Sequence, residues 1–424
     1  MKKVFSLFLI LLIATLFLAS CGGSEKKPAT PDDPSDAETV DDTDPTNPTD
    51  PTDTASNCGN HELDAGEVCD GNAMECSEIN PGYSGYATCN PDCLSWDISA
   101  CQGTPVNPTD PTEPSEPTDP TEPTDPTDPT NPGEVENVFV LGPYFVNIIN
   151  VNSGTDGAPR QFRIYEPTGA EGNIPVIHFL HGFMYKIDYY DNILTHLASH
   201  GFIVVSSQSD HAMMNGDTTI VEAEKVGTFL NWLKQNIPAK VSVTADVEHF
   251  GISGHSRGGK VSNRVLNSNP AIATSFFGVD PVDSAPPFAG FIGGDDPQSL
   301  NDPVQFTGES FFLGTELGPN GMQACAPSGD NSVRFYASYP SPSHHIIAAG
   351  VGHADMVDDQ SECGMYCSLC AKSGNNELNQ QFMAYTGGLM AAFFNFTLKG
   401  ETQYEALLND SSTHPFATAL TEHK

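Results

Sequence analysis

Basic residues are scarce in this 424-residue sequence, which has 17 Lys and Arg against 55 Asp and Glu and a formal net charge of −38. Proteins bind nucleic acids and anionic lipid surfaces mainly through clusters of Lys and Arg. The charge of this chain therefore argues against both kinds of partner. We predict no nucleic-acid binding.

Long apolar runs and metal-ligand patterns are also lacking. After residue 18, no segment approaches the roughly 20 apolar residues of a membrane-spanning helix. Five histidines lack the spacing that is typical of metal ligands: His181, His211, His255, His344 and His345. We therefore expect no second membrane segment, no metal and no cofactor.

The one apolar run, residues 4–18, follows a basic start and precedes small residues, as in a secretory signal peptide. Residues 18–21 read Leu-Ala-Ser-Cys, which resembles a bacterial lipobox. The resemblance implies that the signal (1–20) is cleaved and that Cys21 carries a lipid. The protein would then be exported and anchored to a bacterial membrane, most naturally the outer membrane, or displayed at the cell surface. The alternative is an ordinary signal peptide that ends near a cysteine.

Two proline-rich linkers follow, at 21–57 and 102–136. Proline recurs at every third position from 105 to 132, with Thr, Asp and Glu between most of them. Proline lacks the amide donor of helix and sheet, and a three-residue repeat fits polyproline II. Both segments are therefore predicted to be disordered or extended stalks that separate domains.

A cysteine-rich module (58–101) lies between the linkers. Its six cysteines predict three disulfides of undetermined connectivity, because so small an exported unit has little apolar core. These are Cys58, Cys69, Cys76, Cys89, Cys93 and Cys101. The segment resembles short cysteine-rich repeats of bacterial surface proteins. Its acidic residues are expected to form a solvated loop, with a Ca²⁺ site as the alternative.

Residues 137–424 are long enough for one large domain in which strand and helix patterns alternate. Strands are predicted at 162–165, 176–180, 202–206, 249–252, 274–279, 310–313 and 345–349. Helices are predicted at 190–200, 219–235, 259–266 and 376–397. This alternation predicts an α/β fold with a mostly parallel sheet covered on both faces.

The segment Gly254-His255-Ser256-Arg257-Gly258 contains the pattern G-x-S-x-G between a predicted strand and a predicted helix. In that setting the pattern predicts a sharp turn that holds a serine above the sheet, with glycines where side chains would clash. Ser256 is the candidate nucleophile. The alternative is a glycine-rich turn without chemistry.

Other polar residues follow predicted strands and are expected at the same edge of the sheet. His353 is the candidate base, and the order Ser256, acid, His353 is that of α/β-hydrolases. The amide groups of Arg257 and of Phe183 or Met184 are candidates for an oxyanion hole. The candidate pocket residues beside it are His181, Met184 and Tyr185. Asp280, Asp283 and Glu316 all remain possible acids.

Seven stretches resemble chlorophyllases: 174–183 (IPVIHFLHGF), 200–205 (HGFIVV), 254–259 (GHSRGG), 278–282 (GVDPV), 314–318 (GTELG), 325–327 (CAP) and 352–356 (GHADM). The scaffold is more loosely similar to platelet-activating-factor acetylhydrolases and cutinase-like polyester hydrolases. This resemblance implies an α/β-hydrolase fold and places the acid at Asp280, with Glu316 second and Asp283 third. It does not cover the linkers or the cysteine module.

Four cysteines of the large domain remain: Cys325, Cys363, Cys367 and Cys370. Their spacing superficially resembles an iron–sulfur ligand set, but an exported chain favours two disulfides. One of these is expected to join Cys325 to the 363–370 segment and so to support the loop after His353.

These features together predict a lipid-anchored serine carboxylic-ester hydrolase acting through Ser256, His353 and Asp280. Its predicted partner is a small or polymeric ester with an apolar group, such as a lipid, a polyester or a chlorophyllase-type substrate. The alternative is a surface binding or adhesion protein that uses the hydrolase fold for recognition.

Overall fold

The computed structural model describes residues 137–209, 217–284, 296–321, 324–361 and 364–424, together with short strands between residues 73 and 103. The chain divides into two units, Met1–Pro108 and Thr109–Lys424. The predicted signal, Cys21, the first linker and the second linker beyond Gly103 lie outside the described residues, as do Cys58, Cys69, Cys76, Cys93, Cys101 and Cys363.

The first unit contains two small antiparallel sheets. One has the order β1-β3-β4 and the other pairs β2 with β5. The strands are β1 Ala73–Glu75, β2 Tyr83–Ser84, β3 Tyr86–Cys89, β4 Trp96–Asp97 and β5 Gln102–Gly103. Cys89 therefore ends a strand, and β5 extends into the first two residues of the segment predicted to be a linker.

The second unit is built on a nine-stranded sheet with the order β14-β13-β12-β11-β10-β8-β9-β7-β6. The central strands from β9 to β13 are parallel, whereas β6, β7 and β14 run antiparallel to their neighbours. The strands are β6 Phe145–Val151, β7 Phe162–Thr168, β8 Asn173–Leu180, β9 Ile203–Ser207, β10 Thr244–His255, β11 Ser275–Val279, β12 Glu309–Thr315, β13 Ser343–Ala348 and β14 Thr418–His423.

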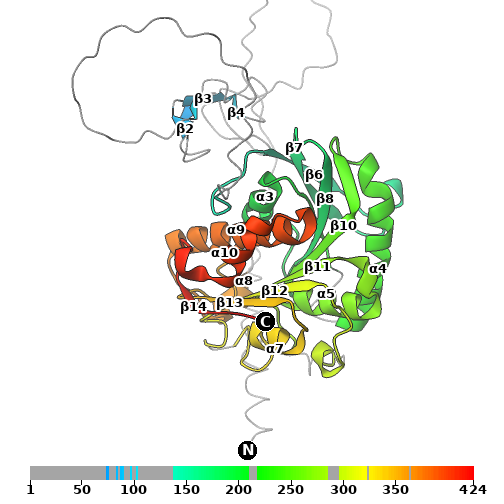
Figure 1. The fold of residues 1–424 in the computed structure, drawn as a ribbon, viewed down its shortest axis with the longest axis vertical. Coiled ribbons are helices and arrows are strands. Elements are labelled where there is room, and N and C mark those ends of the chain that lie inside the picture. Colours follow the sequence, from blue (N-terminus) through cyan, green and yellow to red (C-terminus); the bar gives the residue numbers. More distant parts are fainter. Residues whose placement is uncertain are drawn as a thin grey trace, which may run out of the picture. The chain divides into compact units, whose positions relative to one another are not determined.

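Helices cover both faces of this sheet (Figure 1). The helices α3, α9 and α10 lie on one face, and α4 and α5 lie on the other. The helices are α3 Asp191–Ser199, α4 Thr219–Asn236, α5 Arg257–Ser268, α7 Ser332–Ser338, α8 Gly364–Leu369, α9 Asn376–Lys399 and α10 Glu405–Asn409. Because each face has its own apolar cluster, the central strands are buried on both sides and read as continuous apolar runs.

The predicted α/β fold is confirmed, but the limits of most elements differ and some elements were not predicted. The seven predicted strands and four predicted helices are present, most with wider limits; β10, for example, begins at Thr244 rather than at residue 249. The edge strands β6 and β14 and the helices α7, α8 and α10 were not predicted. None of the described helices is both long and apolar enough to cross a bilayer.

Parallel pairing decides where the candidate residues meet. The strands β8, β10, β11, β12 and β13 are consecutive neighbours and share one direction. Their carboxyl ends therefore lie along one edge of the sheet, where ligands bind in open α/β sheets. The segments after these strands carry Gly182, Ser256, Asp280, Glu316 and His353.

Candidate active site

The turn at Ser256 is as sharp as the sequence predicted. β10 ends at His255 and α5 begins at Arg257, so Ser256 alone joins them, with φ 55° and ψ −122°. A non-glycine residue with positive φ is strained and persists only where its surroundings hold it. A Cβ on Gly258 would lie 2.0 Å from the carbonyl oxygen of Leu180, and one on Gly254 would lie 2.5 Å from the Gly258 backbone. The glycines are therefore required by close packing.

Ser256, His353 and Asp280 are joined by two hydrogen bonds. Nε2 of His353 lies 2.8 Å from Oγ of Ser256, and Nδ1 of the same ring lies 2.7 Å from Oδ2 of Asp280. An ionised carboxylate can only accept, so Nδ1 carries the proton and Nε2 accepts from the serine hydroxyl. Bonded in this order, a histidine can take the proton of a serine hydroxyl.

The Asp280 carboxylate is held in place from a second side. It is 1 % exposed, and its backbone has a φ of 37° directly after β11. Oδ2 also accepts from the Thr315 hydroxyl at 2.8 Å, and Oδ1 accepts from the Thr315 amide at 3.3 Å. The end of the neighbouring strand β12 therefore fixes which oxygen faces His353.

The other two acids considered from the sequence contact different groups. Glu316 is exposed, and its Oε2 accepts from the amide of Gly350 at 2.8 Å, which steadies the loop that leads to His353. Asp283 is buried and accepts from the amide and hydroxyl of Ser299 at 2.6 and 2.5 Å. Neither has a hydrogen bond to His353 in the described part of the chain.

Asp355 and a disulfide organise the loop around His353. The buried carboxylate of Asp355 accepts from the amides of Gly352 and Ser373 at 2.8 and 2.7 Å. The disulfide Cys325–Cys370 ties the segment before Ser373 to the chain that follows β12. Cys367 is also disulfide-bonded. These links hold two loops that flank the His353–Asp280 contact.

The loop after β8 lies against the serine. A Cβ on Gly182 would be 3.3 Å from Cβ of Ser256. Nε2 of His181 accepts from the Ser209 amide at 2.9 Å, so Nδ1 carries the proton and donates to the Gly182 carbonyl at 2.9 Å. In a trans peptide the carbonyl and the next amide point in opposite directions. The Phe183 amide therefore points away from the His181 ring.

The four residues predicted to form the oxyanion loop and the pocket differ in solvent exposure. Phe183 and Met184 are half-buried, and Met184 has a φ of 62°. His181 is 1 % exposed, and burial lowers its pKa to about 4. Tyr185 is also buried, and its hydroxyl contacts Sγ of Cys367 at 3.3 Å. Burial and the protein partners of His181 and Tyr185 indicate support of the loop, whereas Phe183 and Met184 retain some solvent exposure.

Arg257, the residue after the serine, is anchored by its side chain. Its guanidinium pairs with Glu222 of α4, and the two side chains are 7 % and 0 % exposed. It also donates to the carbonyl of Asp217 at 2.8 Å. Because the first amides of a helix have no acceptor within the helix, the Arg257 amide is suited to bind a ligand oxygen. Glu222 was not predicted to support the site, because in the sequence it is one more acidic residue of a helix.

Two further residues, Tyr190 and His255, were not predicted to take part in the site. The His255 ring centroid lies 4.5 Å from that of His353, and the Tyr190 hydroxyl lies 2.6 Å from Nδ1 of His255. His255 stands inside the G-x-S-x-G motif, which is the only sequence signal for it. Tyr190 precedes α3 and carries no motif.

Asp358 allows a prediction on the pH dependence of stability. It lies in the loop after His353, beside the first turn of α3, and accepts from the amide of Asn192 at 3.2 Å. Burial, with a smaller contribution from Asp191, raises its pKa from the usual range of an aspartate to about 7. Ionisation of Asp358 therefore opposes folding. The protonated carboxyl adds to the free energy of unfolding at low pH, and this contribution is lost as pH rises from about 4 to about 7.

We expect Asp358→Asn to raise the Tm relative to the wild type, because the amide keeps an acceptor for Asn192 and cannot ionise. The advantage should be largest at pH 7 and above and should shrink toward pH 4.5. Thermal unfolding across that range measures it. Parallel curves for the two proteins would contradict the assignment.

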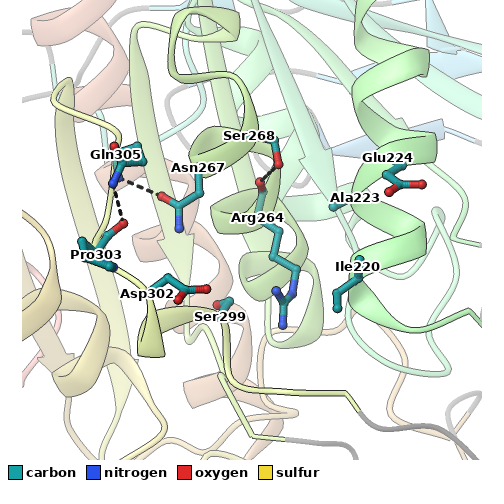
Figure 2. Close-up of a pocket in the computed structure, with 10 residues that line it drawn as sticks. All are labelled: Ile220, Ala223, Glu224, Arg264, Asn267, Ser268, Ser299, Asp302, Pro303 and Gln305. Atoms are coloured by element: carbon teal, nitrogen blue, oxygen red, sulfur yellow. Dashed lines mark hydrogen bonds between the residues drawn. The ribbon is translucent and has the colours of Figure 1, made fainter.

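A separate pocket of about 320 Å³ lies between α4 and α5 (Figure 2). Its lining includes Ile220 and Glu224 of α4 and Arg264 of α5. The Arg264 guanidinium is already bonded to Thr219 at 2.8 Å and to the Pro297 carbonyl. None of the lining residues is a site candidate, so we assign this pocket no part in the chemistry.

The mixed sheet, the strained Ser256 turn and the histidine loop after β13 define the class of the domain, which is an α/β-hydrolase fold. The family model for chlorophyllase matches residues 134–424, more than two thirds of the chain. The chain belongs to the chlorophyllase family. The match excludes the predicted signal, the first linker and the cysteine module, and it includes only the last three residues of the second linker, 134–136.

Individual relatives agree with the family. Chlorophyllase-1 of Arabidopsis thaliana is 32% identical over 288 residues, which cover 62% of this chain and 85% of that protein. Chlorophyllase-2 of the same plant is 28% identical over 310 residues, 65% of this chain and 92% of the relative. The chloroplastic Chlorophyllase-1 of Citrus sinensis is 30% identical over 300 residues, with shares of 68% and 88%. These matches support a hydrolase of the α/β type and the ester hydrolase class.

Proposed function

We propose that the large domain is a serine carboxylic-ester hydrolase that works through an acyl-enzyme. The observation that carries this proposal is the pair of hydrogen bonds from the His353 ring, 2.8 Å to Ser256 and 2.7 Å to Asp280. They arise at the ends of three different strands, and membership of the chlorophyllase family supports the same reading. A glycine-rich turn without chemistry has no need of such partners.

The proposed reaction begins when Oγ of Ser256 attacks the ester carbonyl and its proton passes to Nε2 of His353. Asp280 stabilises the resulting imidazolium, and the amides of Phe183 and Arg257 bind the developing oxyanion. His353 then returns the proton to the leaving alcohol, and the acyl group remains on Ser256. Water, activated by the same histidine, releases the acid and restores the serine.

The proposed substrate is an ester with an apolar acyl or alcohol group. Phe183 and Met184, the partly exposed residues beside the serine, supply apolar surface. The relatives are named chlorophyllases, and a chlorophyllase-type ester is one of three candidates, with lipids and polyesters as the others. A panel of p-nitrophenyl esters of increasing chain length would give the preferred acyl length, and a flat profile would argue against an apolar acyl site.

A fluorophosphonate probe tests the proposal directly, since it reacts covalently only with an activated serine. We expect a single adduct on Ser256 in the folded protein, located by mass spectrometry. Absence of that adduct would overturn the enzyme proposal and favour the alternative, a surface binding or adhesion module on a hydrolase scaffold.

We also propose that the domain is displayed outside the cytoplasm on a lipid anchor at Cys21, with the proline-rich segments as stalks. The lipobox-like residues 18–21 motivate this proposal. Expressed in a bacterium, the full chain should partition into detergent, and Cys21→Ser should release it to the aqueous phase. Equal partitioning of the two proteins would contradict the anchor.

A further inference from the structure

A single buried hydroxyl lies between the loop after β8 and the strand that carries the serine. Tyr190 is fully buried, and its Oη accepts from the amide of Gly182 at 3.2 Å. The same oxygen lies 2.6 Å from Nδ1 of His255. We assign His255 the tautomer in which Nδ1 accepts, so that the Tyr190 hydroxyl accepts from Gly182 and donates its proton to His255. Burial keeps both side chains neutral, because it raises the pKa of Tyr190 and lowers that of His255.

His255 in turn packs against the candidate base. Its ring centroid is 4.5 Å from that of His353, with 38° between the planes. The ring of Tyr185 stacks on His255 at 5.7 Å and 13°. A neutral ring in this place limits where the His353 ring can lie without adding a second positive charge when His353 is protonated.

Gly182 connects the hydroxyl to the other half of the site. Its amide is the one bound by Tyr190, and a Cβ at this position would lie 2.9 Å from Nδ1 of His255. The next residue is Phe183, whose amide is part of the proposed oxyanion hole. The loop therefore rests directly on the His255 ring, and Tyr190 fixes the contact.

We propose that Tyr190 and His255 are positioning residues that hold both the Phe183 amide and the His353 ring in their places beside Ser256. This inference rests on the proposed serine hydrolase function. The transition state needs both groups at once, since one binds the oxyanion while the other carries the proton. The ground state needs neither as strictly, so their misplacement should lower kcat more than it changes KM.

Tyr190→Phe is the sharpest test, because it removes one oxygen and keeps the ring. The chain offers a matched control in Tyr385 of α9, a buried tyrosine whose hydroxyl lies 2.7 Å from Nδ1 of His414. Nε2 of His414 bonds the Leu407 carbonyl, so the Tyr385 hydroxyl donates just as that of Tyr190 does. Both substitutions should lower the Tm by about 2–4 °C for each buried bond lost.

Only Tyr190→Phe should change turnover. With a p-nitrophenyl ester we expect kcat to fall by about 10- to 100-fold with KM within about threefold, whereas Tyr385→Phe stays within about twofold of the wild type. Equal kcat values for the two variants, with wild-type hydrolysis intact, would overturn this inference alone. Absence of hydrolysis and of a Ser256 adduct in the wild type would overturn the proposed function and, with it, this inference.

His255 provides a second pair of variants should Tyr190→Phe fail to fold. His255→Leu removes both the acceptor and the aromatic ring. We expect a similar 10- to 100-fold loss of kcat, which is the effect of misplacing a catalytic group by about 1 Å. His255→Asn keeps an acceptor near Nδ1 for the Tyr190 hydroxyl and should recover part of that loss. A folded His255→Leu protein with wild-type kcat would contradict the positioning role.

Discussion

Replacing Ser256 with alanine is expected to lower kcat for any ester that the protein hydrolyses by about 10⁵- to 10⁶-fold and to abolish fluorophosphonate labelling. The loss is large because the Oγ atom is the attacking group, and His353 then has no hydroxyl from which to take a proton. Residual hydrolysis should remain above the rate in water, since the Phe183 and Arg257 amides would still bind the oxyanion. A substrate panel and the labelling assay measure both effects.

Ser253 supplies the control. It is a buried serine of β10, three residues before Ser256, and its hydroxyl donates to the Phe277 carbonyl at 2.7 Å. Ser253→Ala should lose about 1 kcal/mol of stability and keep kcat within a few fold. Thermal unfolding should show that Ser256→Ala remains folded. Unchanged labelling of a folded Ser256→Ala protein would place the reactive serine elsewhere.

Much of the fold could be predicted because the central strands are buried on both faces. Their apolar runs stand out in the sequence, as in the segments that become β8 and β11. The edge strand β14 has no such signal, since its residues are half-buried or exposed, and it is held by pairing with β13. The length of β10 was also missed because its first half is polar and partly exposed.

The site was predictable in its chemistry and less so in its geometry. The serine turn and the histidine carry motifs, whereas the choice among three acids depends on which strand ends become neighbours. Pairing of β11 with β12 and of β12 with β13 brings Asp280 and Thr315 beside the His353 loop. A sequence motif also does not show whether a residue is buried. His181 and Tyr185 were expected in a pocket wall, but solvent exposure is set by the packed loops around them.

The second large effect concerns the acid. We expect Asp280→Asn to lower kcat by about 10⁴-fold while the protein stays folded. The surrounding donors decide how the new amide is oriented. The Thr315 amide, 3.3 Å from Oδ1 of Asp280, can only donate, whereas the Thr315 hydroxyl at Oδ2 can turn to accept; the asparagine oxygen is therefore expected at the Oδ1 position. Its NH₂ group then replaces Oδ2 and faces Nδ1 of His353, which lies 2.7 Å from Oδ2 in the wild type.

A donor in that position reverses the tautomer of the histidine. Nδ1 must now accept, the ring proton moves to Nε2, and Nε2 can no longer take the proton of Ser256. Glu316→Gln is the matched control, because the amide oxygen can still accept from Gly350 and the side chain is exposed. We expect this variant to keep kcat within about threefold, as surface substitutions away from such contacts have small effects. A large loss in Glu316→Gln with little change in Asp280→Asn would move the acid to the end of β12.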